Sequence, residues 1–357
     1  MRLSAPVGFV VAGLALAAVP LFKPPAFYES FLYLVFHWVV LATSWNILSG
    51  YSGYFSFGHG AFFGIGMYTT AKLATAFEVP FLWTLVAAGA IAAVAGVGIG
   101  AVVFRVRRLR GELFALLTLA VTFVLATIVL NTSIDGGPGV FLSGVALPKI
   151  YAAPASTIYV LGLAIAAISL GLAWHIQHAK LGRGLFAIAD DEDVAEVMGI
   201  PTFQYKLIAF AISCFLAGVA GGIHAMFVTY VTVAETFSIT VPLYVVLMSV
   251  LGGARHWIGP AIGAAFVTAL TYAFTGGEWA LAGKAIVGLI LILVILFLPQ
   301  GVMGLFESRR QKKATPSAES LHAAMPQAHT ATPAVVASSE NAPEVLRCEK
   351  VALAFRG

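Results

Sequence analysis

Side chains that could carry out chemistry are scarce in the apolar parts of this 357-residue chain. His37 and His224 lie well inside apolar runs, Lys284 lies near the end of another, and no Asp or Glu occurs in the middle of one. Carriers driven by protons or sodium usually hold carboxylates at the membrane midplane, so this pattern argues against such a carrier and against a proton pump. The runs also hold no Ser/His/Asp set, paired carboxylates or metal-ligand cluster, and the chain has no G-x-x-x-x-G-K-[ST] phosphate loop. We therefore expect no catalytic residue, metal or cofactor here, and no ATP hydrolysis by this chain.

Glycine supplies the positive signal. Residues 48–60, with the sequence LSGYSGYFSFGHG, interrupt apolar sequence on both sides, and residues 252–260 (GGARHWIGP) do so in the other half of the chain. Gly and Ser at this density disfavour a continuous helix, and backbone freed at membrane depth must line a cavity or be buried in protein. Paired interruptions in two halves predict a central substrate path, although ordinary extracellular or interfacial turns are the alternative. We expect the path to be lined by Tyr51, Gly53, Tyr54, Ser56, Phe57, Gly58 and His59.

A short polar segment between Lys180 and Lys206 predicts a helix of about two turns. Asp190 is expected to cap its N-terminus, where the helix dipole favours the carboxylates that follow, and Gly199 is expected to end it. So short a helix is marginal in water unless it docks. Its apolar stripe therefore needs either a cytoplasmic partner or the chain's own bundle; the stripe consists of Val194, Val197 and Met198.

The elements that position these residues must be membrane helices. Hydrophobic residues make up 60% of the chain and charged residues 10%, which excludes a soluble enzyme, a nucleic-acid binder and a disordered protein. A hydrocarbon core takes about 20 helical residues per crossing. The continuous apolar runs predict an all-α polytopic membrane protein with eight to ten crossings rather than a strand barrel. The candidate spans are Val7–Leu21, Phe31–Leu48, Ala61–Phe77, Phe81–Phe104, Leu113–Leu130, Ile158–His175, Leu207–Val228, Val241–Leu251, Ala261–Phe274 and Leu281–Leu298.

Lys and Arg predict the orientation of these spans. Basic clusters occur at 105–110, at 180–183 and at 309–313, and such clusters collect on the cytoplasmic side. The numbers of spans between the clusters agree, so we expect both termini in the cytoplasm and the low-charge loop Asn131–Thr157 outside. The first span has an alternative interpretation as a cleaved signal peptide with Ala15-Leu16-Ala17 at its cleavage site.

The character of the sequence changes after the last span. Residues 1–305 form the predicted transmembrane domain, and residues 306–343 are rich in Ala, Ser, Pro, Gln and Lys, which is typical of a flexible linker. Residues 344–357 return to alternation and predict the first strand of a further domain. Cys214 lies in an apolar run and Cys348 in the polar tail, so no disulfide is expected.

Three strings together resemble the permease subunit of bacterial ABC importers for branched-chain amino acids, and the M-type subunit more than its H-type partner. They are LSGYSGYFSFGHGAFFGIGMYTTA, LGRGLFAIADDEDVAEVMGIPTFQYKLIAFAISCFLAGVAGGIHA and LGGARHWIGPAIGAA, and the resemblance covers about Leu34 to Gly304. Asp193-Val194-Ala195 followed three residues later by Gly199 resembles the E-A-A-x-x-x-G coupling loop of ABC importers, with Asp for Glu and Val for the first Ala. The resemblance implies that this helix inserts into a cleft on the ATPase; its residues are Asp190, Asp193, Ala195, Glu196 and Gly199.

The C-terminal string VLRCEKVALAFRG resembles the first strand of an ABC ATPase domain, and Phe355 matches the aromatic residue that stacks on adenine in that family. An unstructured tail is the alternative. The resemblance implies a fused ATPase domain, or one on a partner, that binds and hydrolyses ATP.

The family resemblance implies a multi-pass protein of the bacterial inner membrane that forms half of a translocation pathway. Its expected partners are the lipid bilayer, a second permease (H-type, or a second copy as a homodimer), ABC ATPase subunits and a periplasmic substrate-binding protein, with no nucleic acid. The binding protein is expected to meet the external loops near Asp135–Val140. Two alternatives stay open: the same permease carrying urea, short amides or another small polar solute, and a channel or ion-coupled carrier without a motor.

Overall fold

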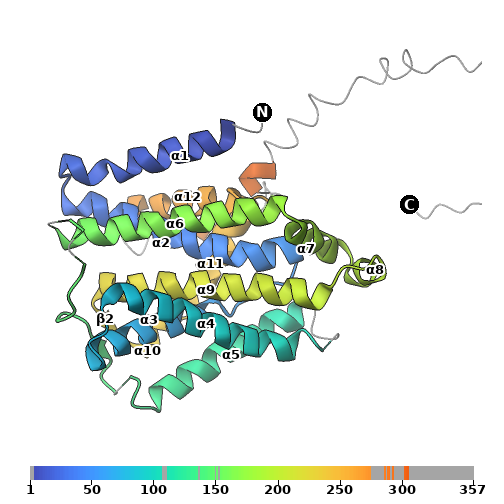
Figure 1. Ribbon diagram of the computed structural model, residues 1–357, viewed down its shortest axis with the longest axis horizontal. Coiled ribbons are helices and arrows are strands. Elements are labelled where there is room, and N and C mark those ends of the chain that lie inside the picture. The colour runs from blue at the N-terminus through green and yellow to red at the C-terminus, as the bar shows by residue number, and fades with distance from the viewer. Residues whose placement is uncertain are drawn as a thin grey trace, which may run out of the picture. The chain divides into compact units, whose positions relative to one another are not determined.

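Long helices dominate the computed structural model of the chain, which describes residues 4–274 apart from 107–110, 136, 149 and 152, together with 285, 286, 288, 289, 292 and 301–304. These residues belong to a unit that covers residues 1–308 (Figure 1). The predicted linker at 306–343, the predicted strand at 344–357 with Phe355, and most of the last predicted span lie outside the described residues. The first three residues and the C-terminal residues also lie outside the described residues, so the cytoplasmic location of the termini stays a prediction.

The described chain is built from helices and one pair of very short strands. The helices are α1 Ser4–Ala17, α2 Ala26–Trp45, α3 His59–Ala76, α4 Phe81–Val103, α5 Glu112–Leu130, α6 Pro154–His178, α7 Lys180–Asp190, α8 Glu192–Val197, α9 Thr202–Val228, α10 Val233–Thr236, α11 Thr240–Gly252 and α12 Gly259–Phe274. A 3₁₀ turn, Val19–Phe22, follows α1, and a π-helical turn, Asn46–Gly50, extends α2. The strands β1 (Val140–Phe141) and β2 (Tyr230–Val231) pair antiparallel.

Six stretches of the described chain are long and apolar enough to cross a membrane, which confirms the prediction of an all-α polytopic membrane protein. They comprise α2 with its π-helical turn, α4, α5, α6, α9 and α10 together with α11. The segment Ala12–Phe22 and α12 are apolar but shorter. Helix α3 is rich in Gly and Thr, and it packs among α4, α5 and α9.

Helix α9 is central to the packing of the bundle, because it contacts α2, α3, α4 and α6 (Figure 1). Lipid is as apolar as the helix surfaces, so close packing of small residues and interhelical hydrogen bonds must drive this association. Gly218 of α9 shows such packing: a Cβ there would lie 2.6 Å from the Ala88 carbonyl oxygen of α4. By contrast, α5 exposes most of its apolar surface. Only 28% of its most apolar 18-residue stretch is buried, against 72% for α2 with its π-helical turn.

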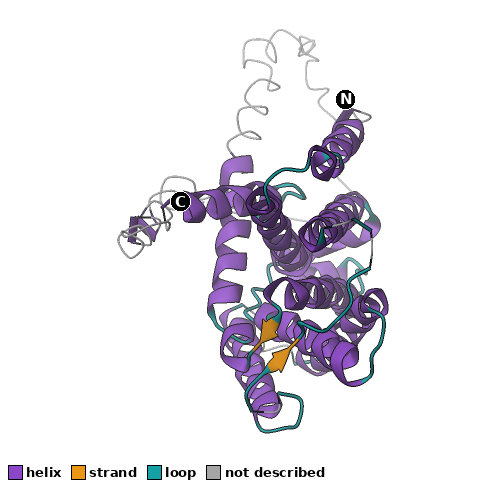
Figure 2. Ribbon diagram, turned by 90° about the vertical axis from the view of Figure 1, so that its left-hand side faces the viewer, coloured by secondary structure: helices purple, strands orange, loops and turns teal. Residues whose placement is uncertain are grey.

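The two ends of the bundle differ. Helices α7 and α8 lie at one end, on the right in Figure 1, and the strand pair lies at the other. Figure 2 looks onto the strand end and shows β1 and β2 side by side, with Phe141 stacked on Tyr230 at 4.2 Å between ring centres. The loop that was predicted to be external therefore lies at the opposite end from Lys180 and Arg183. Within that loop, the buried Asp135 accepts a 2.6 Å hydrogen bond from Tyr68 of α3.

Candidate coupling site and glycine-rich segments

The first glycine-rich segment breaks the helical path as predicted. Helix α2 loosens into the π-helical turn Asn46–Gly50, residues 53–57 have no regular structure, and α3 starts at His59. Gly53 adopts φ 73°, a conformation that favours glycine. Neighbouring groups satisfy the freed backbone: the Trp45 indole donates to the Ser56 carbonyl at 2.8 Å, and the Phe57 amide donates to the Thr118 hydroxyl at 2.9 Å. The interruption is thus embedded in protein, and neighbouring side chains satisfy backbone groups that the broken helix leaves free.

The residues predicted to line a path lie together in this segment, but most of them are packed. Tyr51, Tyr54, Ser56, Gly58 and His59 are buried, Phe57 is half-buried and Gly53 is exposed. The Tyr51 hydroxyl donates to the Ala173 carbonyl of α6 at 3.4 Å. The Nε2 atom of His59 lies 3.1 Å from the Ser44 hydroxyl of α2 and 3.2 Å from the Ser213 hydroxyl of α9. These hydrogen bonds support a packing role for His59, and the lining of a path stays a prediction.

The two glycine-rich segments meet at the end of the bundle that carries α7 and α8. The Asn46 side-chain amide donates to the His256 carbonyl at 3.4 Å, and a Cβ on Gly50 would collide with the Ala254 carbonyl oxygen. The Trp257 amide donates to the Gln177 side chain of α6 at 2.8 Å. Interruptions separated by about 200 residues in sequence thus form one layer of irregular backbone beside α7.

Asp191 caps α8, so the prediction that Asp190 does so was wrong. The Asp191 carboxylate accepts hydrogen bonds from the amides of Asp193 at 2.9 Å and Val194 at 3.0 Å. Asp190 instead ends α7, a helix that was not predicted, and its carboxylate pairs with Arg255 of the second glycine-rich segment at 2.8 Å. The reason is that α7 extends as far as Asp190. Because Asp190 has helical backbone, it cannot adopt the extended conformation that an N-cap needs, and Asp191 has that conformation.

A short helix is present where one was predicted, while its coupling role stays a prediction. Helix α8 covers Glu192–Val197, and Gly199 has φ 84°, which confirms that glycine supplies a left-handed turn there. Ala195 is buried against the bundle, whereas Asp193 and Glu196 are exposed; the Glu196 carboxylate accepts a 2.9 Å hydrogen bond from Thr202.

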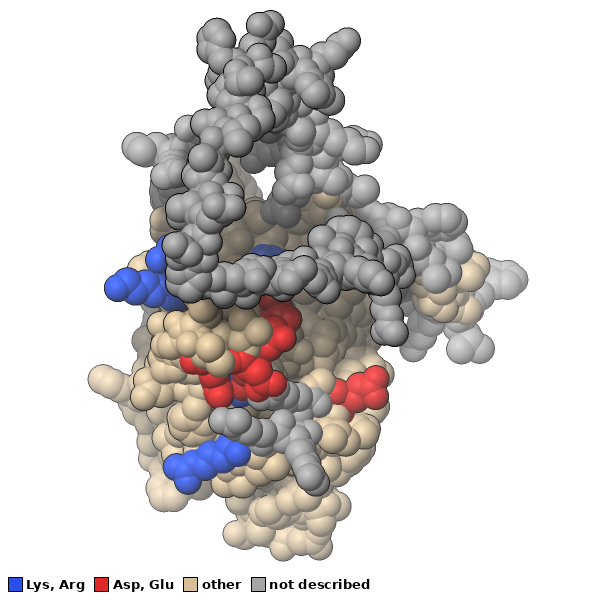
Figure 3. Space-filling view, turned by 90° about the vertical axis from the view of Figure 1, so that its right-hand side faces the viewer, with Lys and Arg blue, Asp and Glu red and all other residues tan. Residues whose placement is uncertain are grey.

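The apolar stripe of α8 points away from the bundle. Val194, Val197 and Met198 are 58%, 88% and 76% exposed, so the spans that the structure describes do not cover the stripe. Figure 3 looks onto this end and shows acidic side chains gathered at its centre, with basic ones to one side; Asp190, Asp191 and Asp193 are exposed here. An exposed apolar tip beside acidic side chains, held out from the bundle, is compatible with the predicted docking role, which stays a prediction.

A buried cluster of polar groups joins α8 to the first glycine-rich segment. The Lys206 ammonium of α9 pairs with the Glu192 carboxylate of α8, and it donates to the Tyr54 hydroxyl at 3.1 Å. Tyr54 in turn donates to the second oxygen of Glu192 at 2.5 Å. The ammonium also lies 4.6 Å from the Tyr54 ring centre and 5.3 Å from that of Phe104. Because all three polar residues are buried, moving α8 without moving Tyr54 would expose an unpaired charge to a poorly solvated interior.

Sequence reasoning missed Lys206 and the inward position of Glu192. One signal was available: Lys206 is the lone charge within the 27 residues of α9, and a long apolar helix keeps such a charge only when it is paired. Its contact with Tyr54 could not be predicted from the sequence, since the two residues lie 152 positions apart. Within the described ranges, no three His, Cys, Asp or Glu residues gather closely enough to hold a metal ion.

Comparison with known proteins places these features in a family context. The family described as "Branched-chain amino acid transport system / permease component" matches residues 27–296. The high-affinity branched-chain amino acid transport system permease protein LivM of Escherichia coli is 27% identical over 323 residues, which is 83% of this chain and 74% of that protein. The corresponding LivH protein of Salmonella typhimurium is 27% identical over 288 residues, 75% of this chain and 91% of LivH. No solved structure gives a significant match.

Proposed function

Because this chain belongs to the family of branched-chain amino acid transport system permease components, we propose that it is one of two membrane subunits of an ATP-driven importer. Its substrates are branched-chain amino acids, the compounds that the names of LivM and LivH give for their transport system. The main support for an ATP-driven mechanism is the exposed apolar tip of α8, formed by Val194, Val197 and Met198. We infer that a protein partner covers this tip.

The partners follow from the two surfaces that the chain presents. An H-type permease completes the pathway, since both M-type and H-type proteins are among the relatives. An ABC ATPase receives α8 on the cytoplasmic side of the inner membrane, where ATP is bound and hydrolysed. A periplasmic binding protein delivers the substrate at the opposite end of the bundle, where β1 and β2 lie (Figure 2).

Movement of the ATPase passes from α8 into the membrane through two connections. Glu192 ties α8 to Tyr54 and Lys206, and Asp190 at the end of α7 ties the same region to Arg255. Tyr54 and Arg255 belong to the two glycine-rich segments. A shift of α8 therefore displaces both irregular segments together and opens or closes the route beside Tyr51–His59, while the packed helices move as rigid bodies.

The docking of α8 is tested by placing charge on its tip. Val197→Asp leaves the bundle untouched because the side chain is 88% exposed, yet it puts a carboxylate into the apolar contact with the ATPase. We expect the variant to insert and fold normally but to lose copurification of the ATPase and amino-acid uptake, each by about tenfold or more. The matched control is Val106→Asp, an exposed valine just after α4, which should keep both. Full copurification and uptake by Val197→Asp would show that α8 is only a connector.

A further inference from the structure

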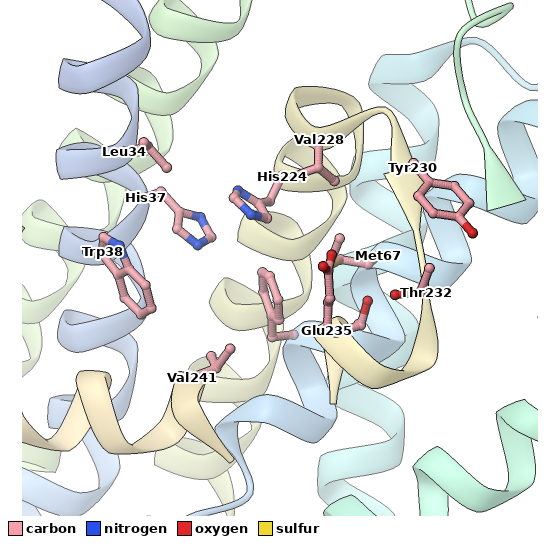
Figure 4. A pocket seen from close by; sticks show the side chains of 12 residues that line it. Leu34, His37, Trp38, Met67, His224, Val228, Tyr230, Thr232, Glu235 and Val241 are labelled. Carbon is pink, nitrogen blue, oxygen red and sulfur yellow. The ribbon is translucent and has the colours of Figure 1, made fainter. Parts of the chain in front are cut away.

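A cavity of about 240 Å³ lies at the opposite end of the bundle from α8, and no coupling contact described above uses it. Its walls come from α2, α3 and α9 and from the chain that follows α9 through β2 and α10 to the start of α11 (Figure 4). Apolar side chains form most of the lining, among them Trp38, Phe63 and Met67. The polar exceptions include His37, His224 and Glu235, which extend into the cavity from three different elements.

The two histidines form the polar wall of this cavity. Their rings stack with centres 4.2 Å apart and planes 18° from parallel, and the Nδ1 atom of His224 lies 3.3 Å from the Tyr33 hydroxyl. His37 is only 4% exposed, and its Nδ1 atom has no hydrogen-bond partner among the described residues. A buried polar atom without a partner costs free energy, and structures seldom retain one unless a ligand or water completes it. His59 Nδ1 also has no partner among the described residues, but His37 lines a cavity, so a group bound there can satisfy its free nitrogen.

The chemistry of the lining defines that group. Glu235 offers an exposed carboxylate and His37 an imidazole nitrogen from different walls of the cavity, and apolar side chains line most of the remaining wall. A ligand that satisfies all three has a cation, an anion and a compact apolar body. We propose that this cavity binds an apolar α-amino acid: Glu235 pairs with the ammonium group, His37 donates to the carboxylate, and Phe63 and Met67 contact the aliphatic side chain. The proposal rests on the proposed transport function and assigns the residues that recognise the substrate.

The position of the cavity links it to the coupling site. Helix α9 carries His224 near one end and Lys206 near the other, and α2 carries His37 and continues into the first glycine-rich segment. A substrate bound between His37 and His224 therefore contacts α9, whose far end contacts α8, and α2, which leads into the segment that holds Tyr54. Binding and ATP-driven movement act on one shared pair of rigid elements.

Ligand-observed NMR on the purified permease–ATPase complex in nanodiscs tests the assignment without the binding protein. The probes are leucine, 4-methylpentanoate, which lacks the amino group, and 3-methylbutylamine, which lacks the carboxylate. We expect Glu235→Gln to weaken leucine and the amine about tenfold but to leave 4-methylpentanoate unchanged, since only the ion pair with the ammonium is lost. We expect His37→Gln to weaken leucine and 4-methylpentanoate but not the amine. A general packing defect would weaken all three probes alike.

Matched controls are Glu78→Gln, an exposed acid after α3, and His175→Gln, an exposed histidine of α6; both should bind like the unmodified complex. The assignment is overturned if the unmodified complex does not bind leucine, if both cavity variants keep full affinity, or if either variant weakens all three probes equally. ATP-dependent uptake by the same complex with its binding protein is measured in parallel. Normal uptake without leucine binding in the cavity would overturn this assignment alone, whereas absence of uptake would overturn the transport function itself.

Discussion

Lys206 is the residue on which the connection between α8 and the membrane helices depends. Its ammonium is buried between Glu192 and Tyr54, and a buried ion pair stabilises little by itself, yet removing one partner leaves the other charge unpaired in the interior. Lys206→Met should therefore destabilise the protein by about 3–5 kcal/mol. The double variant Lys206→Met/Glu192→Gln should recover most of this loss, because no uncompensated charge remains.

Thermal unfolding in detergent, followed by intrinsic fluorescence, gives the comparison. The control is Arg255→Met, which breaks an exposed pair with Asp190 and should cost less than about 1 kcal/mol. The rate of amino-acid uptake distinguishes an effect on coupling from an effect on stability. We expect the double variant to be stable but to take up amino acids slowly, because Tyr54 no longer moves with α8. Equal stability of Lys206→Met and the unmodified protein would show that Lys206 and Glu192 do not form a buried ion pair in the folded protein.

At the scale of elements, α8 depends on the backbone as much as on its side chains. Gly199 has φ 84°, and a Cβ there would meet no atom within 4 Å, so its constraint is conformational rather than steric crowding. Gly199→Ala should cost about 1 kcal/mol and loosen the return of the chain to α9. Gly199→Asn should cost less, since asparagine tolerates the left-handed region better. Hydrogen exchange of the α8 amides measures the difference, and identical exchange in both variants would contradict it.

The sequence allowed some of these elements to be predicted and not others. Continuous apolar runs, the glycine-rich break and the stop at Gly199 are local signals, and the structure confirms each of them. Asp190 and Asp191 are both good capping residues, so only the length of α7 decides between them, and that length depends on packing against α6 and α9. The Lys206–Tyr54 contact and the His37–His224 pair join residues far apart in sequence. Such contacts depend on how whole helices pack, which residue types alone do not determine.

At the scale of the whole molecule, the two ends of the bundle must face opposite sides of the membrane. The positive-inside rule predicts that the end with Lys180 and Arg183 faces the cytoplasm. We expect Arg183→Cys to react with an impermeant maleimide only in inside-out vesicles, and Ser143→Cys in the loop after β1 only in right-side-out vesicles. Both positions are exposed, and Cys214 and Cys348 are first replaced by Ser. Labelling of both positions from the same side would overturn the orientation.

We propose that ATP hydrolysis on a partner drives amino-acid movement through this chain. The most direct measurement is uptake of radiolabelled leucine into proteoliposomes that contain the complete complex, with binding protein outside and ATP enclosed at the α8 side. Ionophores that collapse proton and sodium gradients are added throughout. We predict uptake that requires ATP, is unaffected by the ionophores and is lost in Val197→Asp. Uptake without ATP, or uptake abolished by the ionophores, would contradict the account and favour a channel or an ion-coupled carrier.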